Sequence, residues 1–199
     1  MIAAVVLSAG ESRRMGRPKA LLPIDGSFFL ERIVKSLQAS KVAKILVVLG
    51  HNPGEIEAKI RHLPVTVLVN RDYAQGQLSS LIVAIRALEA DKVDGMLVQL
   101  VDHPFVDPER TNRMTERFYE SNKLIVVPTF KGRRGHPVIF SSRLFGELLA
   151  APLDQGAKSV VHAHEADTLE IETDDEGVTL DIDTPEDYRR HVGRDDVQA

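Results

Sequence analysis

The segment from Leu7 to Pro23 gathers small residues and cations in a short stretch of chain. Ser8, Ala9 and Gly10 end an apolar run, and such small residues let a backbone approach a ligand closely and offer its N–H groups. The cations that follow are Arg13, Arg14, Arg17 and Lys19. This combination suits a triphosphate. The competing interpretation is a basic surface loop whose glycines serve only its turns.

The segment matches neither of two common phosphate-binding motifs. A Walker A loop has four residues between its glycines, whereas five separate Gly10 from Gly16. Lys19 neither follows the second glycine directly nor precedes Ser or Thr. The G-x-G-x-x-G pattern of dinucleotide-binding folds is also absent. Residue types therefore favour phosphate binding here without assigning the loop to either motif.

Two aspartates stand where carboxylates could meet a phosphate ligand. Asp102 follows the apolar run 96–101, and the end of a buried parallel strand opens on a ligand cleft. A carboxylate there can hold Mg²⁺, which prefers oxygen ligands and bridges to substrate phosphates. Asp183 directly precedes a helix start, and Asp181 shares its side-chain parity in an extended segment. The alternative for both Asp102 and Asp183 is an ordinary capping or turn role.

Short apolar runs and helical periodicities alternate along most of the chain, which predicts the elements that position these residues. Strands are predicted at 2–7, 44–49, 65–69, 96–101, 124–127 and 138–140, and helices at 27–37, 54–63, 78–88, 108–119, 142–150 and 157–164. Period-two alternation around Asp175-Glu176-Gly177 predicts a hairpin over 168–182. Thr184 and Pro185 predict a final helix. The expected fold is α/β: a Rossmann-like three-layer α/β/α sandwich, with a mostly parallel sheet and a late antiparallel β excursion.

The composition excludes several classes of protein. The chain has 199 residues, of which 43% are hydrophobic and 27% charged. This length and composition predict one globular domain over residues 1–193, followed by a frayed polar tail at 194–199. A net charge of −4 gives no general attraction to nucleic acid or anionic membrane. No run has the length of a membrane span, and the N-terminus is a poor signal peptide. The absence of cysteine excludes thiolate catalysis and fits a cytoplasmic location.

The first segment resembles the signature L-[AS]-[AG]-G-x-S-x-R-M-G-x-x-K of the MobA-like nucleotidyltransferases, in both order and spacing. The resemblance implies a loop that wraps a triphosphate, with Arg14 and Lys19 as its phosphate-binding, catalytic cations. Ala9 and Gly10, beside Ser8, would meet the nucleotide through the backbone. Arg13 is expected to bind the nucleotide too, with a solvated neighbour of the loop as its alternative.

Two further segments resemble the motifs that form the metal site in this family. The segment 97–106 (LVQLVDHPFV) matches the family's metal aspartate in a D-x-P context, which implies that Asp102 is a catalytic metal ligand. The segment 180–188 (LDIDTPEDY) fits the family's DIDTPED motif, in which the aspartate before Thr-Pro completes the metal site. Asp183 is therefore the expected second ligand of Mg²⁺.

The remaining expected site residues come from three places. Gly132–Phe140 (GRRGHPVIF) resembles the R-G-H-P segment of the molybdenum cofactor cytidylyltransferase branch, which implies that the second substrate faces these residues: Arg134, Gly135 and His136. Asn70 and Ser79-Ser80 match family positions near base and ribose, and Gly50 is expected to border the base. For the two serines a plain helix N-cap is an equal alternative. His162 and His164 do not share a helix face and are expected to be surface residues.

The resemblance implies a Mg²⁺-dependent transfer of CMP from CTP to a molybdopterin-type phosphate acceptor, with release of pyrophosphate. Ala9 and the GHP segment favour this branch, because the guanylyltransferase branch usually has a second glycine where Ala9 stands. Another nucleotide such as GTP, or a sugar- or alcohol-phosphate acceptor, stays open as an alternative. So does a non-catalytic nucleotide- or cofactor-binding chaperone. A molybdoenzyme or its chaperone is a candidate partner; nucleic acid and membrane are not expected.

Overall fold

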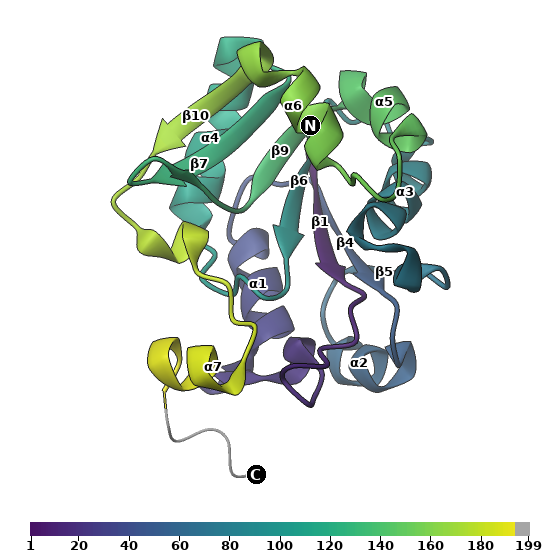
Figure 1. Cartoon of the computed structure of the whole chain (residues 1–199), viewed down its shortest axis with the longest axis vertical. Coiled ribbons are helices and arrows are strands. Elements are labelled where there is room, and N and C mark those ends of the chain that lie inside the picture. Colours follow the sequence, from purple (N-terminus) through teal and green to yellow (C-terminus); the bar gives the residue numbers. More distant parts are fainter. Residues whose placement is uncertain (194–199) are drawn as a thin grey trace.

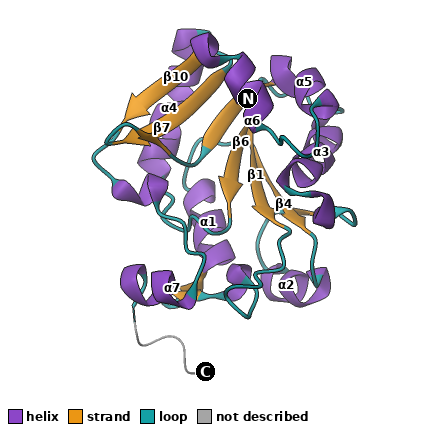
Figure 2. Cartoon of the chain, in the orientation of Figure 1, coloured by secondary structure: helices purple, strands orange, loops and turns teal. Residues whose placement is uncertain are grey.

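The computed structural model of the chain describes residues 1–193 and shows a mostly parallel sheet with helices on both faces (Figures 1 and 2). In sheet order the strands are β10 (Thr168–Glu172), β7 (Ile125–Phe130), β9 (Val138–Ser141), β6 (Gly95–Leu100), β1 (Ile2–Ser8), β4 (Lys44–Leu49) and β5 (Thr66–Val69), with β8 (Arg133–Arg134) beside β7. A separate small hairpin joins β2 (Pro23–Ile24) to β3 (Ser27–Phe28). The predicted frayed tail, 194–199, lies outside the described residues.

The helices cover the two faces of the sheet as separate layers. One face packs against α1 (Phe29–Gln38), α2 (Pro53–Ile60) and α4 (Pro108–Ser121), and the other against α3 (Gln77–Leu88), α5 (Phe145–Ala150) and α6 (Lys158–Ala163). A last helix, α7 (Pro185–His191), follows near the lower end in Figure 1. Within residues 1–193 there is no helix with the length and apolar character needed to cross a membrane.

The central strand β1 explains why both faces are covered. Its alternate residues Ile2, Ala4 and Val6 pack among the side chains of α1, α2 and α4, while the residues between them pack among those of α3, α5 and α6. A strand buried on both faces reads as a continuous apolar run, as this one does. The predicted three-layer α/β/α arrangement is confirmed.

The parallel strands end at one edge of the sheet. β1 pairs in parallel with β4 and β6, and β4 pairs in parallel with β5. In Figure 1 the arrowheads of β1 and β6 point toward the lower half of the molecule, where α2 and α7 lie. Ligands of such sheets bind beyond this edge, so the segments that follow β1, β4, β5 and β6 are the ones that can build a site.

The predicted hairpin over 168–182 is wrong. β10 pairs in parallel with β7, and residues 176–179 form a 3₁₀ turn in place of a strand. The turn forms because Asp175 Oδ1 accepts the N–H of Gly177 (2.7 Å) and the carbonyl of Val178 accepts the N–H of His136 (2.8 Å). The antiparallel excursion of the sheet is β9, which pairs antiparallel with both β6 and β7.

Candidate active site

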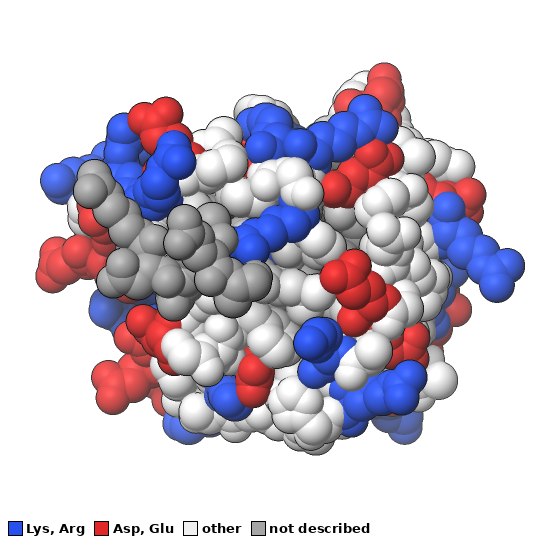
Figure 3. Space-filling view, turned by 90° about the horizontal axis from the view of Figure 1, so that it is seen from below, with Lys and Arg blue, Asp and Glu red and all other residues white. Residues whose placement is uncertain are grey.

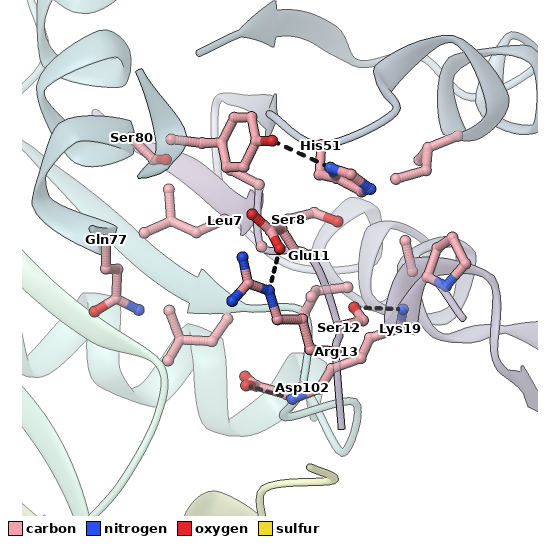
Figure 4. A pocket seen from close by; sticks show the side chains of 18 of the residues that line it. Leu7, Ser8, Glu11, Ser12, Arg13, Lys19, His51, Gln77, Ser80 and Asp102 are labelled. Carbon is pink, nitrogen blue, oxygen red and sulfur yellow. Dashed lines mark hydrogen bonds and ion pairs between the residues drawn. The ribbon is translucent and has the colours of Figure 1, made fainter. Parts of the chain in front are cut away.

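A cavity of about 500 Å³ opens at the carboxyl edge of the sheet, between the loop after β1 and the start of α3 (Figure 4). Its lining comes from residues 7–14, 18–20, 51, 56, 73, 74, 76, 77, 80, 100–102 and 183. Viewed from the lower edge of Figure 1, the surface mixes Lys and Arg with Asp and Glu and shows no broad basic patch (Figure 3). An anionic ligand would therefore be attracted by the cations gathered in the cavity itself.

The loop after β1 is folded back on itself at Ser12. The carbonyl of Ser12 accepts the N–H groups of Met15 and Gly16, both at 3.0 Å, and its hydroxyl accepts the N–H of Lys19 at 3.1 Å. Ser12 has a left-handed backbone (φ 54°) that this tight return requires. Met15 is buried and anchors the loop. The fold of the loop therefore brings Arg14 and Lys19, five positions apart in the chain, to the same end of the cavity.

Two cations and two carboxylates meet at this end. Lys19 Nζ lies 3.2 Å from Asp102 Oδ2 and also contacts Asp183 Oδ1, and an Arg14 nitrogen lies 2.6 Å from Asp183 Oδ2. The Lys19 side chain is only 11% exposed. Burial is the largest influence on Asp183 and opposes its charge, but the hydrogen bonds and charges of Lys19 and Arg14 outweigh it and lower its pKa. Figure 4 shows the Lys19 side chain extending to Asp102, with a dashed line joining the two.

The donor set fits a hard divalent cation. Asp102 Oδ1 is buried and has no hydrogen-bond partner among the described residues, although the other oxygen of the same carboxylate contacts Lys19. Within residues 1–193 no group of three or more His, Asp or Glu side chains is arranged to hold a metal. A metal here would therefore take Asp102 and Asp183 and complete its shell from phosphate and water, which is how Mg²⁺ usually binds.

Helix α7 fixes the place of Asp183. Thr184 Oγ1 accepts the N–H of Asp187 at 3.2 Å, and Asp187 Oδ2 accepts the N–H groups of Thr184 (2.8 Å) and Asp183 (3.3 Å), a capping box. Tyr188 is buried and donates its hydroxyl to the carbonyl of Pro23 at 2.6 Å. Because Pro23 ends the segment that begins at Leu7, this contact holds α7, and Asp183 with it, against the loop after β1.

The sequence that forms this fold and this site also matches a known protein family. A model of the MobA-like NTP transferase domain matches residues 4–168. The chain belongs to this family. It is a nucleotidyltransferase of the MobA-like type, and the predicted resemblance is confirmed.

Three similar proteins give the family its context. The purine catabolism protein PucB of Bacillus subtilis (strain 168) is 30% identical over 192 residues, with 92% of each chain covered. The molybdenum cofactor cytidylyltransferase of Escherichia coli (strain K12) is 25% identical over 190 residues, again with 92% of each covered. The crystal structure of Rv0371c from Mycobacterium tuberculosis in complex with manganese superimposes with a TM-score of 0.81 at 30% identity, covering 96% of this chain and 97% of that one.

The structure divides the predicted nucleotide-binding residues of this MobA-like protein into two groups. Ser8, Ala9, Gly10, Arg13 and Ser80 line the cavity. The other predicted residues, Gly50, Asn70 and Ser79, are not among its lining residues.

Asn70 is buried behind the cavity wall, 2% exposed. Its amide nitrogen donates to the hydroxyls of Ser79 (2.8 Å) and Ser80 (3.0 Å), and its oxygen accepts the N–H of Asp72 (2.9 Å). The side chain therefore joins the end of β5 to the start of α3. In this arrangement Asn70 orients Ser80 toward the cavity and has no free amide group to offer a base.

Gly50 packs behind Ala9 and Tyr73, two residues that line the cavity. A Cβ on Gly50 would lie 2.6 Å from both the carbonyl oxygen of Ala9 and the Cβ of Tyr73, so only glycine fits between them. The carbonyl of Ala9 accepts the N–H of His51 (3.1 Å), and the ring of His51 is hydrogen-bonded to the Tyr73 hydroxyl (3.1 Å). The sequence predictions did not include His51 and Tyr73, although His51 directly follows Gly50, which was predicted to border the base.

Arg13 lies over the cavity in an ion pair with Glu11 (Figure 4). The hydrogen bond from Arg13 is the main reason why the pKa of Glu11 is lowered. Glu11 occupies a variable position of the signature and was not expected at the site. Arg13 is the more exposed of the two, so its side chain can turn toward a bound phosphate at little cost.

The three predicted acceptor-binding residues are consecutive in the chain but have different surroundings. Arg134 forms ion pairs with Glu165 and Glu170, away from the cavity. Gly135 is packed so closely under the carbonyl of Val178 that a Cβ has no room. Of the three, only His136 is placed near Asp102, where its ring meets a residue that the sequence did not single out.

That residue is His103, directly after Asp102. The His103 and His136 rings are 4.7 Å apart, and the Nδ1 atoms of both are buried without a hydrogen-bond partner among the described residues. Burial and the neighbouring His103 lower the pKa of His136 to about 4, against the opposing charge of Asp102 and a contact with the carbonyl of Val98. Burial also lowers the pKa of His103. The two imidazoles border Asp102 on the side of β9.

Replacing Asp187 with alanine is expected to destabilise the protein and slow turnover, because three hydrogen bonds that fix Thr184 and Asp183 are lost. A lost cap costs about 1 kcal/mol, which corresponds to a drop in Tm of about 2–4 °C for a chain of this size. Thermal unfolding followed by circular dichroism measures it. Glu186→Ala, the adjacent carboxylate, is the control and is expected to change Tm little.

The same variant has an expected pH dependence. Hydrogen bonds, above all from Thr184, hold the pKa of Asp187 below its usual value. A carboxylate with a lowered pKa stabilises the fold above its unfolded pKa of about 4 and stops doing so as the pH falls through its folded pKa. The Tm difference between wild type and Asp187→Ala should therefore shrink below about pH 4. A difference that stays constant down to pH 2.5 would contradict the capping role.

Proposed function

We propose that this protein transfers CMP from CTP to a molybdopterin-type phosphate acceptor and releases pyrophosphate, with Mg²⁺ as its metal. The observation that carries the proposal is the meeting of Arg14 and Lys19 with Asp102 and Asp183 at one end of the cavity. Two cations suit the leaving pyrophosphate, and two carboxylates suit the metal that accompanies it. The similarity to the Escherichia coli cytidylyltransferase supports the choice of donor and acceptor.

The reaction requires positioning and charge neutralisation more than covalent chemistry. A phosphate oxygen of the acceptor attacks the α-phosphorus of CTP, the bond to the β-phosphate oxygen breaks, and no enzyme intermediate forms. Arg14 and Lys19 hold the β- and γ-phosphates and stabilise the charge that grows on them. The backbone around Gly10 faces the triphosphate. Mg²⁺, held by Asp102 and Asp183, would supply positive charge to the α-phosphate and the acceptor phosphate.

The acceptor is proposed to lie on the side of His136. In-line attack requires it to approach opposite the pyrophosphate, which the loop after β1 holds. The His103–His136 pair borders Asp102 and presents partly exposed imidazoles there. Arg134 and Gly135 would then act by shaping the loop that carries His136. We place the reaction in the cytoplasm, with a molybdoenzyme or its chaperone as the protein that receives the product.

A pyrophosphate-release assay tests the proposal. Purified protein, Mg²⁺ and molybdopterin are combined with CTP, GTP, ATP or UTP in turn, and CTP is expected to give the fastest release. Release that requires another phosphate acceptor in place of molybdopterin would replace the proposed acceptor. Binding of nucleotide without release under any of these conditions would favour a non-catalytic chaperone.

CTP is expected to be preferred over GTP because Ala9 narrows the cavity beside the base. Ala9 lines the cavity, and its methyl group lies close to Gly50. A mismatch of about one methylene is worth roughly 1–3 kcal/mol, so Ala9→Gly should relax the preference by about tenfold or more. The values of kcat/KM for both nucleotides with one acceptor measure it.

The control for this comparison is Ala74→Gly, the same change elsewhere on the cavity wall. It should leave the ratio of the two kcat/KM values unchanged. The carbonyl of Ala9 and the amide of Asn70 already have partners, so hydrogen bonds to the cytosine edge would come from Ser80 and Gln77. GTP turnover equal to or faster than CTP turnover would overturn the cytidylyl assignment and leave the family assignment intact.

A further inference from the structure

A buried glutamine interrupts the apolar face of β6. Gln99 is 1% exposed. On the same side of the strand, its neighbours Leu97 and Val101 belong to the cluster that packs against α1 and α4. A leucine or methionine would fill this place without removing an amide from water, which carries a free-energy cost. The sequence thus has a polar residue at a position where packing favours an apolar one. Such a mismatch between residue and environment often marks a functional constraint.

The amide of Gln99 is only half satisfied. Its nitrogen donates to the carbonyls of Leu100 (3.0 Å) and His103 (2.7 Å). Its oxygen, Oε1, is buried and has no hydrogen-bond partner among the described residues. An unpaired buried carbonyl is destabilising. Stability therefore does not explain why a glutamine stands here. Its two donated hydrogen bonds indicate that it holds the turn at residues 100–103.

That turn carries Asp102. The two carbonyls bound by Gln99 lie on either side of Asp102 in the chain, and the N–H of His103 closes the same turn onto Leu100 O at 3.2 Å. The carbonyl of Asp102 in turn accepts the N–H of Ile182 at 2.8 Å, which sets the segment that ends in Asp183. One side chain thus fixes the turn of one carboxylate and, through Ile182, the place of the other.

We propose that Gln99 is a positioning residue for the divalent metal held by Asp102 and Asp183. The inference rests on the proposed metal site but not on the choice of nucleotide or acceptor. Without the amide nitrogen, the carbonyl of His103 loses its bond to Gln99 and the turn can relax, which moves the Asp102 carboxylate. Groups that orient metal ligands in this way typically change metal affinity or activity by about 10–100-fold.

The test uses Gln99→Met, which keeps the volume and removes the amide. Three quantities are measured: the affinity of the protein for Mn²⁺ without nucleotide, followed by electron paramagnetic resonance; the affinity for CTP in EDTA; and the Tm. We expect Mn²⁺ affinity to fall by about 10–100-fold, with CTP affinity in EDTA and Tm close to those of wild type. Leu97→Met, a conservative change on the same face of β6, is the control and should alter none of them.

Other outcomes separate the possibilities. Unchanged Mn²⁺ affinity overturns the proposal, as does a large fall in Tm with normal Mn²⁺ affinity of the folded protein. If the methionine variant does not fold, Gln99→Asn serves instead, because its amide is one methylene too short to span both carbonyls and should also weaken Mn²⁺ binding. Failure of the transfer reaction with CTP and molybdopterin would overturn the proposed function while these metal titrations still decide the role of Gln99.

Discussion

An Asp102→Asn variant is expected to fold normally and to retain less than about one-thousandth of the wild-type transfer rate, a loss at the upper end for one transition-state group. Asparagine keeps the shape of the side chain and removes the charge. Asp102 Oδ1 is buried and has no hydrogen-bond partner within residues 1–193, while Oδ2 contacts Lys19, so Oδ1 is the oxygen available to a metal. A neutral amide there binds a hard cation poorly. Pyrophosphate release at ordinary Mg²⁺ concentration measures the loss.

Asp107→Asn is the matched control. Asp107 caps α4 by accepting the N–H groups of Glu109 (2.6 Å) and Arg110 (3.2 Å), and asparagine caps helices as well as aspartate does. The same chemical change five residues along the chain should leave turnover and Tm unchanged. Wild-type turnover in Asp102→Asn, with a normal response to Mg²⁺, would remove Asp102 from the metal site.

The parts of the fold that the sequence predicted are those set by local pattern. The strands predicted at 2–7, 44–49 and 96–101 appear within one residue of the expected bounds, because these segments are mostly apolar and almost entirely buried. Thr184 and Pro185 start α7 because their preferred backbone geometry acts within one turn. The proximity of Arg14 and Lys19 also depends on local structure, because short-range hydrogen bonds of Ser12 fold the loop after β1. Phosphate binding by this loop stays a prediction.

The predictions that failed or changed depend on partners far away in the chain. Residues 178–182 alternate like a strand, but the carbonyl of Val178 accepts the N–H of His136, more than 40 positions earlier in the chain. Arg134 forms ion pairs with Glu165 and Glu170, and no local sequence pattern predicts pairs over this distance in the chain. Asn70 ends its strand as expected, yet its side chain turns back to the serines of α3. A strand end fixes the position of a residue but not the direction of its side chain.

Lys19→Ala is expected to reduce kcat/KM by about 10²–10³-fold, and Arg14→Ala by a similar factor. Lys19 Nζ is held at the cavity floor, 3.2 Å from Asp102 Oδ2, with a side chain that is only 11% exposed. A cation there is worth more than one in open solvent, because water screens it less. Its loss removes charge that would stabilise the leaving pyrophosphate. Steady-state kinetics with CTP as the varied substrate measure the effect.

Arg17→Ala provides the control, since Arg17 belongs to the same loop but is not among the residues that line the cavity. The Arg17→Ala change removes one positive charge, as Lys19→Ala and Arg14→Ala do, and should change kcat/KM little. The comparison separates direct contacts of Lys19 and Arg14 with the triphosphate from the overall positive charge of the loop. Metal titration separates Lys19 from Asp102: Lys19→Ala should bind Mn²⁺ at least as well as wild type, because a cation beside both carboxylates is gone, whereas Asp102→Asn should bind it poorly. Normal kinetics in both Lys19→Ala and Arg14→Ala would mean that the triphosphate binds elsewhere.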